Sequence, residues 1–209
     1  FDIKGKEYEQ KDLAYSDEGI SINADKIKLS GTGTQANKQI NLNGAVENSA
    51  TIYTKEGLKT KDLTNTGTVQ AINKIEVEGN LTNKGEILTN GNLTAKDTTS
   101  TKKLIAKEGV SVDKLENSGI VATDKNLNVN GNLKNKGKIQ AANRIDVKNN
   151  VDNSGEIQTL DNINIKGNVV NTGDILTNGS LTSKDVKNDK VISVSKDINI
   201  SKLENTGNV

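Results

Sequence analysis

One pattern recurs along most of this chain and limits what it can fold into. A large aliphatic residue is followed by Asn two positions later, Gly at four, a second aliphatic residue at six and a small residue at eight. The clearest copy consists of Leu63, Asn65, Gly67, Val69 and Ala71, followed by the aliphatic pair Ile75 and Val77. A unit this short cannot bury its own apolar edge, so copies of the unit must stack on one another.

The copies keep a nearly constant spacing. From Val46 onward the units begin 17, 18, 34, 18, 18, 18 and 34 residues apart. We interpret each interval of 34 as two units of 17, the second of which has lost the Asn and the Gly. The aliphatic pairs that these two degenerate units keep are Val110 with Val112 and Ile198 with Ile200. Residues 63–121 align without gaps on residues 151–209, which indicates that a block of 88 residues has been duplicated.

The repeat pattern divides the chain into two parts. Residues 46–209 hold the regular repeats, whereas residues 1–45 carry aliphatic pairs without the Asn and Gly, and we expect degenerate β-helix coils or an edge segment there. The first 19 residues, which include Phe1, Tyr8 and Tyr15, are either a damaged first turn or a flexible end. The chain has no Met and no signal-peptide pattern at its start. We therefore expect it to come from a longer or processed protein, in which further coils or caps cover both ends.

The spacing of apolar residues inside each unit predicts strands. Aliphatic residues at offsets 0, 6, 12 and 14 alternate with polar ones, and a period of two is typical of strands. Each unit therefore predicts three short strands, and stacking places each aliphatic residue about 4.8 Å from its counterpart in the next coil. The predicted fold is all-β, a right-handed single-stranded parallel β-helix with about 18 residues per coil and eleven or twelve coils. The alternative is a left-handed β-helix; the uneven unit lengths and the parallel-crossover rule favour the right hand.

The recurring Asn and Gly form the candidate structural site. Alternation directs the Asn inward, where its amide bonds the corner backbone and the next Asn in a ladder. The alternative is an Asn that merely tolerates a turn. The predicted ladder consists of Asn48, Asn65, Asn83, Asn117, Asn135, Asn153, Asn171 and Asn205. The predicted corner glycines, with Gly-Asn at a second corner, suit positive φ; they are Gly67, Gly85, Gly119, Gly137, Gly155, Gly173 and Gly207.

Composition agrees with a narrow aliphatic core. Hydrophobic residues make up 32% of the chain and aromatic residues only 2%, which also leaves intrinsic disorder as an alternative. The 28 Lys and Arg are mixed with 27 Asp and Glu, a balance that argues against nucleic-acid binding. No segment approaches the ~18 apolar residues of a membrane helix. The absence of Cys excludes disulfides and thiolate metal sites.

The run Leu133–Ala141, written Leu-x-Asn-x-Gly-x-Ile-x-Ala and followed by Ile145 and Val147, resembles the filamentous haemagglutinin repeat. The resemblance extends from about Val46 to Val209, with units slightly shorter than is usual in that family and richer in Lys and Asn. It implies a right-handed parallel β-helix that a dedicated two-partner transporter secretes across the Gram-negative outer membrane. Members of the family include adhesins and the stick-like proteins of contact-dependent growth inhibition. Neither the family's amino-terminal secretion domain nor a carboxy-terminal toxin is visible in this chain.

These features together predict a structural role. We expect a shaft of a large secreted or surface-exposed bacterial adhesin, projecting a distal binding or toxin domain. The partners that the resemblance implies are the outer-membrane transporter during export and a host or neighbouring-cell receptor, bound through other parts of the parent chain. The expected location is outside a Gram-negative cell or on its surface. No cofactor is expected.

A carbohydrate-active β-helix enzyme is the alternative from another functional class. The chain has no His and no Cys, and carboxylates such as Glu86, Glu156 and Asp174 fall at outward offsets, so we assign no catalytic residue and expect no enzyme. A calcium site is not expected either, because the isolated Asp97 and Asp185 offer too few oxygens. Sugar binding on the polar faces is a weaker alternative, since Tyr53, expected to be exposed, is the one aromatic residue inside a recognisable coil.

Overall fold

The computed structural model describes residues 2–209, which form 28 β-strands and no helix. The chain makes two compact units, Phe1–Lys107 and Glu108–Val209, which are described in turn. Because the described residues are entirely strand and loop, none of them forms a helix with the length and hydropathy of a membrane span.

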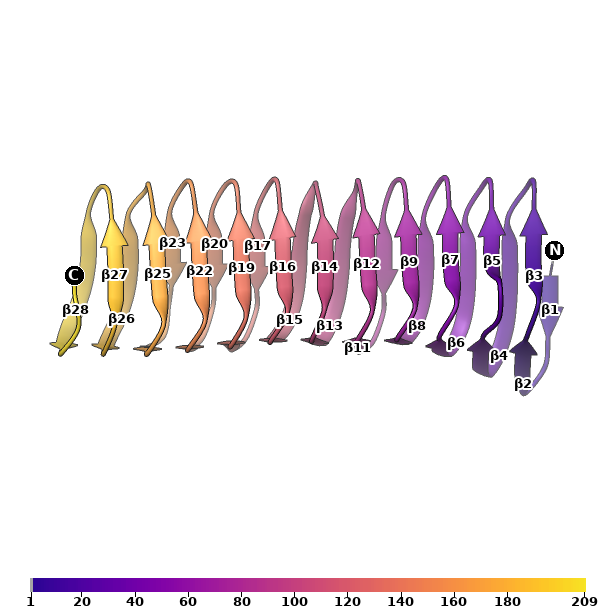
Figure 1. The fold of residues 1–209 in the computed structure, drawn as a ribbon, viewed down its shortest axis with the longest axis horizontal. Coiled ribbons are helices and arrows are strands. Elements are labelled where there is room, and N and C mark those ends of the chain that lie inside the picture. The colour runs from indigo at the N-terminus through magenta and orange to yellow at the C-terminus, as the bar shows by residue number, and fades with distance from the viewer. Residues whose placement is uncertain (1) are drawn as a thin grey trace. The chain divides into compact units, whose positions relative to one another are not determined.

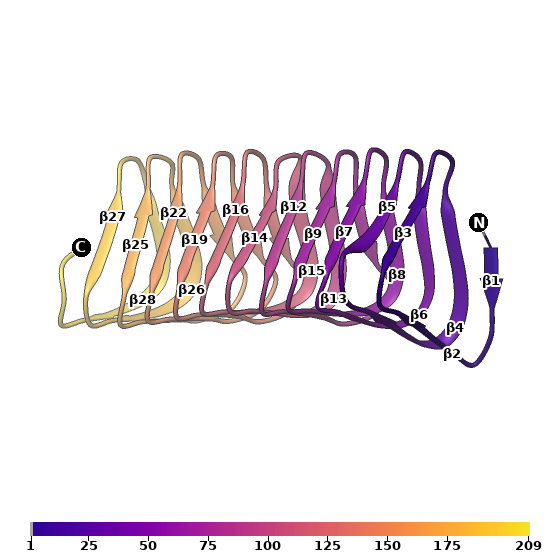
Figure 2. The same ribbon diagram turned by 45° about the vertical axis from the view of Figure 1, so that its right-hand side comes forward.

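The first unit winds through two sheets. Sheet 1 receives one strand from each coil, and these strands lie side by side in Figure 1. They are β3 (Leu13–Ser16), β5 (Gly33–Ala36), β7 (Thr51–Thr54), β9 (Thr68–Ala71), β12 (Glu86–Thr89) and β14 (Lys103–Ala106). Sheet 2 receives the rest of each coil: β1 (Asp2–Lys4), β2 (Glu7–Gln10), β4 (Ile20–Leu29), β6 (Ile40–Asn48), β8 (Leu58–Asn65), β10 (Ile75–Val77), β11 (Leu81–Asn83) and β13 (Asn92–Ser100). The turned view shows β5 and β7 facing β4 and β6 across the coil (Figure 2).

The second unit repeats this arrangement with five strands in sheet 1. They are β16 (Ile120–Thr123), β19 (Lys138–Ala141), β22 (Glu156–Thr159), β25 (Asp174–Thr177) and β27 (Val191–Val194). Its part of sheet 2 consists of β15 (Gly109–Asn117), β17 (Leu127–Val129), β18 (Leu133–Asn135), β20 (Ile145–Val147), β21 (Val151–Asn153), β23 (Ile163–Ile165), β24 (Val169–Asn171), β26 (Leu181–Asn188) and β28 (Ile198–Asn205). Neighbouring strands pair in parallel, as between β19 and β22.

The pairing register confirms the predicted coil. In sheet 1, Ile139 lies beside Ile157, and Ile157 lies beside Ile175, each 18 residues further along the chain. With one sheet 1 strand per coil, the first unit has six coils and the second has five. The all-β parallel solenoid with about 18 residues per coil is therefore as the sequence predicted. The right-handed winding stays a prediction from the crossover rule.

The core of each unit is a set of aliphatic rows. Leu133, Val151 and Val169 stand in register in β18, β21 and β24, and each is at most 2% exposed. The residues between them on these strands, such as Lys134 and Asp152, are exposed. Alternation therefore places one aliphatic side chain on another along the whole row, which removes their apolar surface from water.

The difference between coils of 17 and 18 residues lies at one corner of sheet 2. In 18-residue coils three residues separate two short strands, as at residues 78–80 between β10 and β11. In 17-residue coils only two residues stand there, and one strand continues through, as in β13 and β26. Asp97 and Asp185 both occupy this shorter corner, one in each copy of the duplicated block. Their recurrence thus marks the two-residue form of this corner.

The segment before Val46 is also wound into coils. Residues 2–16 form β1, β2 and β3, which pair in parallel with β4 and β5. The strands β4 and β6 then pair with a shift in register between Asn23 and Lys26. Phe1, which the sequence analysis grouped with this segment, lies outside the described residues.

The alternation of inward and outward residues can be tested at two neighbouring positions of β26. Leu181 is fully buried, whereas Thr182 is exposed. Replacing Leu181 by Asp buries an unpaired carboxylate, and we expect it to lower the free energy of unfolding by several kcal/mol. Denaturant unfolding followed by circular dichroism measures the loss. Thr182→Asp is the matched control, and a comparable loss there would contradict the alternation.

Candidate functional site

The inward Asn side chains of the first unit form a hydrogen-bonded row. Asn48 donates from Nδ2 to Oδ1 of Asn65 at 2.8 Å, and Asn65 donates in the same way to Asn83 at 3.0 Å. All three are at most 2% exposed. The row ends at Ser100, whose hydroxyl accepts from Asn83 at 3.3 Å. The degenerate unit at this point has therefore lost the Asn, but it still supplies an acceptor.

The second unit has a longer row of the same kind. Five amide-to-amide bonds of 2.7 to 2.9 Å join each Asn to the next; they link Asn117, Asn135, Asn153, Asn171, Asn188 and Asn205. Asn188 is missing from the predicted ladder because the degenerate unit that contains it was predicted to have lost its Asn, and that prediction is wrong. The signal was present, since Asn188 stands two residues after Val186.

Each amide in the row also holds the corner backbone. The Nδ2 of Asn135 bonds to Asn153 Oδ1 in the row. It also lies within hydrogen-bond distance of two backbone oxygens, Gly137 O at 3.1 Å and Glu156 O at 3.0 Å. Asn135 Oδ1 accepts from Asn117. One buried side chain therefore ties together three consecutive coils. A buried polar group without hydrogen-bond partners costs about 1–3 kcal/mol. Asn can occupy the core because its amide makes all of these hydrogen bonds.

The corner glycines serve close stacking, and the expectation of positive φ is wrong. Among the described residues, positive φ occurs only at Gly31, Gly33 and Gly109, none of which belongs to either predicted corner. A Cβ on Gly155 would instead lie 2.1 Å from the carbonyl oxygen of Gly137 in the preceding coil. The same 2.1 Å separation recurs for Gly67, Gly85, Gly137, Gly173 and Gly207. Glycine favours close stacking here, because a Cβ would press against the carbonyl of the preceding coil.

The two degenerate units show what happens without this glycine. In the first unit Lys102 stands at this position, and the next backbone nitrogen, Lys103 N, donates to Gly85 O at 3.3 Å. The equivalent bond from Glu86 N to Gly67 O, which follows a glycine, is 2.9 Å. In the second unit Lys190 stands at this position, and Val191 N donates to Gly173 O at 3.4 Å. The equivalent bond from Glu156 N to Gly137 O is 2.8 Å. A side chain at this position thus accompanies a longer hydrogen bond between coils.

A third row, of hydroxyl groups, closes the corner after sheet 1. Thr89 is 4% exposed; its Oγ1 accepts from Gly91 N at 3.1 Å and donates to Asn73 O at 3.0 Å. Thr54 in the first unit and Thr159 and Thr177 in the second make the same two kinds of contact. The sequence analysis noted only that a small residue stands here. In the sequence this position changes between Thr and Ala from coil to coil, which was the available sign of a hydroxyl row.

Some of the outward charges pair with their neighbours. Lys59 Nζ lies 3.4 Å from Glu76 Oε1 and 2.7 Å from Glu78 Oε1, and Lys74 Nζ lies 3.0 Å from Glu76 Oε2. The Lys74 ammonium, followed by Lys59, lowers the pKa of Glu76. A lowered carboxyl pKa favours the folded state above the usual carboxyl pKa, and this contribution is lost as the pH falls through the folded-state value. These pairs lie at the surface, so each stabilises little.

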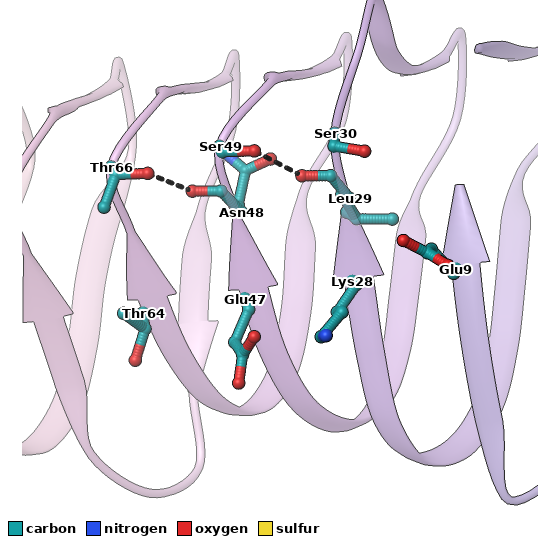
Figure 3. Close-up of a pocket in the computed structure, with 9 residues that line it drawn as sticks. All are labelled: Glu9, Lys28, Leu29, Ser30, Glu47, Asn48, Ser49, Thr64 and Thr66. Carbon is teal, nitrogen blue, oxygen red and sulfur yellow. Dashed lines mark hydrogen bonds between the residues drawn. The ribbon is translucent and has the colours of Figure 1, made fainter. Parts of the chain in front are cut away.

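The outer faces carry hollows in which several polar side chains already bond to the protein itself. One, in the first unit, measures about 380 Å³ (Figure 3). Three of its hydroxyls bond to the backbone: Ser30 Oγ to Gln10 O at 2.8 Å, Ser49 Oγ to Leu29 O at 3.3 Å and Thr66 Oγ1 to Asn48 O at 3.2 Å. The charges beside them, Glu9, Lys28 and Glu47, alternate in sign along the row. Two hollows of about 560 and 410 Å³ in the second unit are lined by outward polar residues together with aliphatic ones such as Val170.

Of the carboxylates considered for catalysis, Glu156 and Asp174 are register partners on the neighbouring strands β22 and β25, and each forms an ion pair with a lysine. Glu156 pairs with Lys138 at 3.1 Å and Asp174 with Lys190 at 3.3 Å, while Glu86 is exposed. Across residues 2–209, no three acidic side chains gather as a potential metal site. Tyr53, expected to be exposed, is half-buried on the outer face of sheet 1, in register with two Gln residues.

Comparisons with family models, with curated proteins and with solved structures found no match. The resemblance to the filamentous haemagglutinin repeat therefore rests on the repeated residues of the chain itself.

The contribution of the Asn row can be measured at Asn135. Asn135→Ala deletes its bonds and leaves the Asn117 donor and the Asn153 acceptor without their partner, so we expect a loss of about 2–4 kcal/mol in the free energy of unfolding. Denaturant unfolding measures it. Asn128→Ala, on the outer face of β17, is the matched control and should change stability by less than ~0.5 kcal/mol. Equal effects would show that the row adds nothing beyond ordinary packing.

The need for close stacking can be measured at Gly155. Its replacement by Ala forces apart the coils that meet at the Gly137 carbonyl, and we expect a loss of about 1–3 kcal/mol, determined by thermal or denaturant unfolding. Gly5→Ala is the control, because its Cβ would lie 3.5 Å from the nearest atom. If Gly155→Ala proved as harmless as Gly5→Ala, steric exclusion would not explain the glycine row.

Proposed function

We propose that this chain is part of the shaft of a large secreted or surface-exposed bacterial adhesin or toxin-carrying stick protein, and that its role is structural rather than catalytic. In such a shaft the number of coils sets how far a distal domain stands from the cell. The observation that carries the proposal is the coil-to-coil repetition of the same interior contacts within each unit.

The repetition makes the coils interchangeable. Asn65 bonds to Asn83 at 3.0 Å in the first unit, and the positions 88 residues later, Asn153 and Asn171, are joined at 2.8 Å in the second. A gene can therefore add a block of coils without altering the contacts that each coil makes. A change of length at constant cross-section is what a spacer requires.

The outer faces favour a supporting role over a recognition role. Several of their charged side chains pair with one another, and three hydroxyls of the hollow in the first unit bond to the backbone. A binding site would instead direct several polar groups toward a shared point. We therefore assign receptor or target-cell binding to other parts of the parent chain.

Secretion by a two-partner outer-membrane transporter, and a location outside a Gram-negative cell, are part of the same proposal. They follow from the resemblance of the Leu-x-Asn-x-Gly repeat to filamentous haemagglutinin. The lack of Cys is compatible with export, since no thiol has to be protected from oxidation. Coils that stack on their predecessors also suit a chain that folds progressively as it emerges.

The test uses the parent protein in its source bacterium. Antibodies against residues 108–209 should label intact cells or detect the protein in the medium. Deleting residues 63–150, one repeat block of 88 residues, joins the chain in register, and we expect labelling to persist. Deleting residues 63–141 joins it out of register by nine residues, and we expect labelling to be lost because the inward rows no longer match.

Two outcomes would contradict the proposal. Labelling that appears only after the cells are permeabilised would place the protein inside them. Turnover of a panel of acidic and neutral glycans by the purified chain would instead support a carbohydrate-active enzyme.

A further inference from the structure

The chain contains four Asn-Gly pairs, residues 43–44, 90–91, 130–131 and 178–179. In this dipeptide the backbone nitrogen of Gly can attack the side-chain carbonyl carbon of Asn, because Gly has no Cβ to hinder the approach. The attack needs a glycine nitrogen that is free to lose its proton and an Asn side chain that is free to rotate. The four pairs differ in both respects.

Two pairs, related by the 88-residue duplication, have an occupied glycine nitrogen. Gly91 N donates to Thr89 Oγ1 at 3.1 Å, and Gly179 N donates to Thr177 Oγ1 at 3.0 Å. Each Thr hydroxyl is fixed in turn by donating to a carbonyl of the preceding coil. The N–H that would have to be deprotonated is therefore stabilised at both sites.

A third pair is enclosed in a strand. Gly44 is buried in β6, where a Cβ would lie 1.8 Å from the carbonyl oxygen of Ala24. Asn43 is half-buried, and its Nδ2 donates to Asn23 Oδ1 at 2.6 Å. This side chain cannot turn toward the following nitrogen without leaving the sheet.

The fourth pair lies at the corner between β17 and β18 and has neither protection. Asn130 is exposed, and its side chain makes one hydrogen bond, from Nδ2 to the exposed Asp113 carboxylate at 3.3 Å. Within residues 2–209 the Gly131 N–H has no hydrogen-bond acceptor.

We propose that Asn130 is a site of spontaneous deamidation and isoaspartate formation. The Gly131 nitrogen bonds to Asn130 Cγ and gives its proton to water, and the side-chain nitrogen departs as ammonia. The cyclic imide that results is opened by one water molecule at either carbonyl, which yields Asp or isoaspartate. Water is the only co-reactant.

The modification changes a corner on which the coil depends. The new carboxylate replaces an amide that donates to Asp113, so a hydrogen bond becomes a repulsion between like charges. Isoaspartate also adds a methylene to the main chain at this three-residue corner between β17 and β18. The pairing of Leu127 with Ile145 and of Leu133 with Val151 spans that corner, so the product loosens this coil first.

The experiment follows deamidation of the whole chain in mildly alkaline buffer. Cleavage after Lys yields separate peptides 85–96, 126–134 and 167–184, and tandem mass spectrometry locates the modified residue in each. We expect Asn130 to react at least about fivefold faster than Asn90 or Asn178, the factor that one hydrogen bond to the glycine nitrogen would supply. In urea the three rates should converge.

Two variants separate protection by the hydroxyl from general rigidity. Thr177→Ala, a residue that already occupies this row at Ala141, should raise the rate at Asn178 by about fivefold and leave Asn130 unchanged. Asn130→Gln should abolish modification in peptide 126–134 and leave the other two peptides unchanged. Equal rates at the three Asn in the folded chain, or an Asn130 preference that persists in urea, would overturn the proposal.

Discussion

The fold depends on one constraint: every buried side chain in a stacked coil meets its own counterpart one coil away. For Leu, Ile and Val this constraint stacks aliphatic side chains on aliphatic side chains, and it requires only that their sizes match. For a polar residue the constraint is stricter, because no water reaches the interior. Asn meets it, since one amide both donates and accepts and can bond to an identical group above and below. The rows that begin at Asn48 and Asn117 use this property, and each amide also holds the corner backbone.

Close approach of the corners follows from the same stacking. With coils about 4.8 Å apart, a corner that turns over the carbonyl of the previous coil leaves little space for a side chain. Glycine occupies most of these positions, and the bonds next to Lys102 and Lys190 are longer. Thr hydroxyls close the corner after sheet 1 by bonding the next N–H and a carbonyl of the preceding coil. The interior and the corners are thus specified residue by residue.

The outer faces carry much less specification, and this contrast supports a spacer role. Outward positions change freely between Lys, Glu, Asp, Thr and Val along one row, as at residues 134, 152 and 170, while the inward row beside them stays aliphatic. At such positions an Asn-Gly pair can react where no hydrogen bond holds the glycine N–H. Asn130 and Gly131 stand at such a place, whereas the corresponding atoms at residues 91 and 179 are held by a Thr hydroxyl.

The repeat alone determined the strands, the parallel stacking, the coil length and the inward direction of Asn, because a period of two and a fixed interval leave one arrangement that buries the repeated aliphatic residues. It also contained Asn188, which was overlooked when its unit was judged by the missing glycine. Only the tertiary structure decided why glycine is needed, since the distance from Gly155 to the Gly137 carbonyl depends on how closely two coils approach. The same holds for the Thr bonds: alternation states which side a residue faces, but contact between coils sets which atoms it can reach.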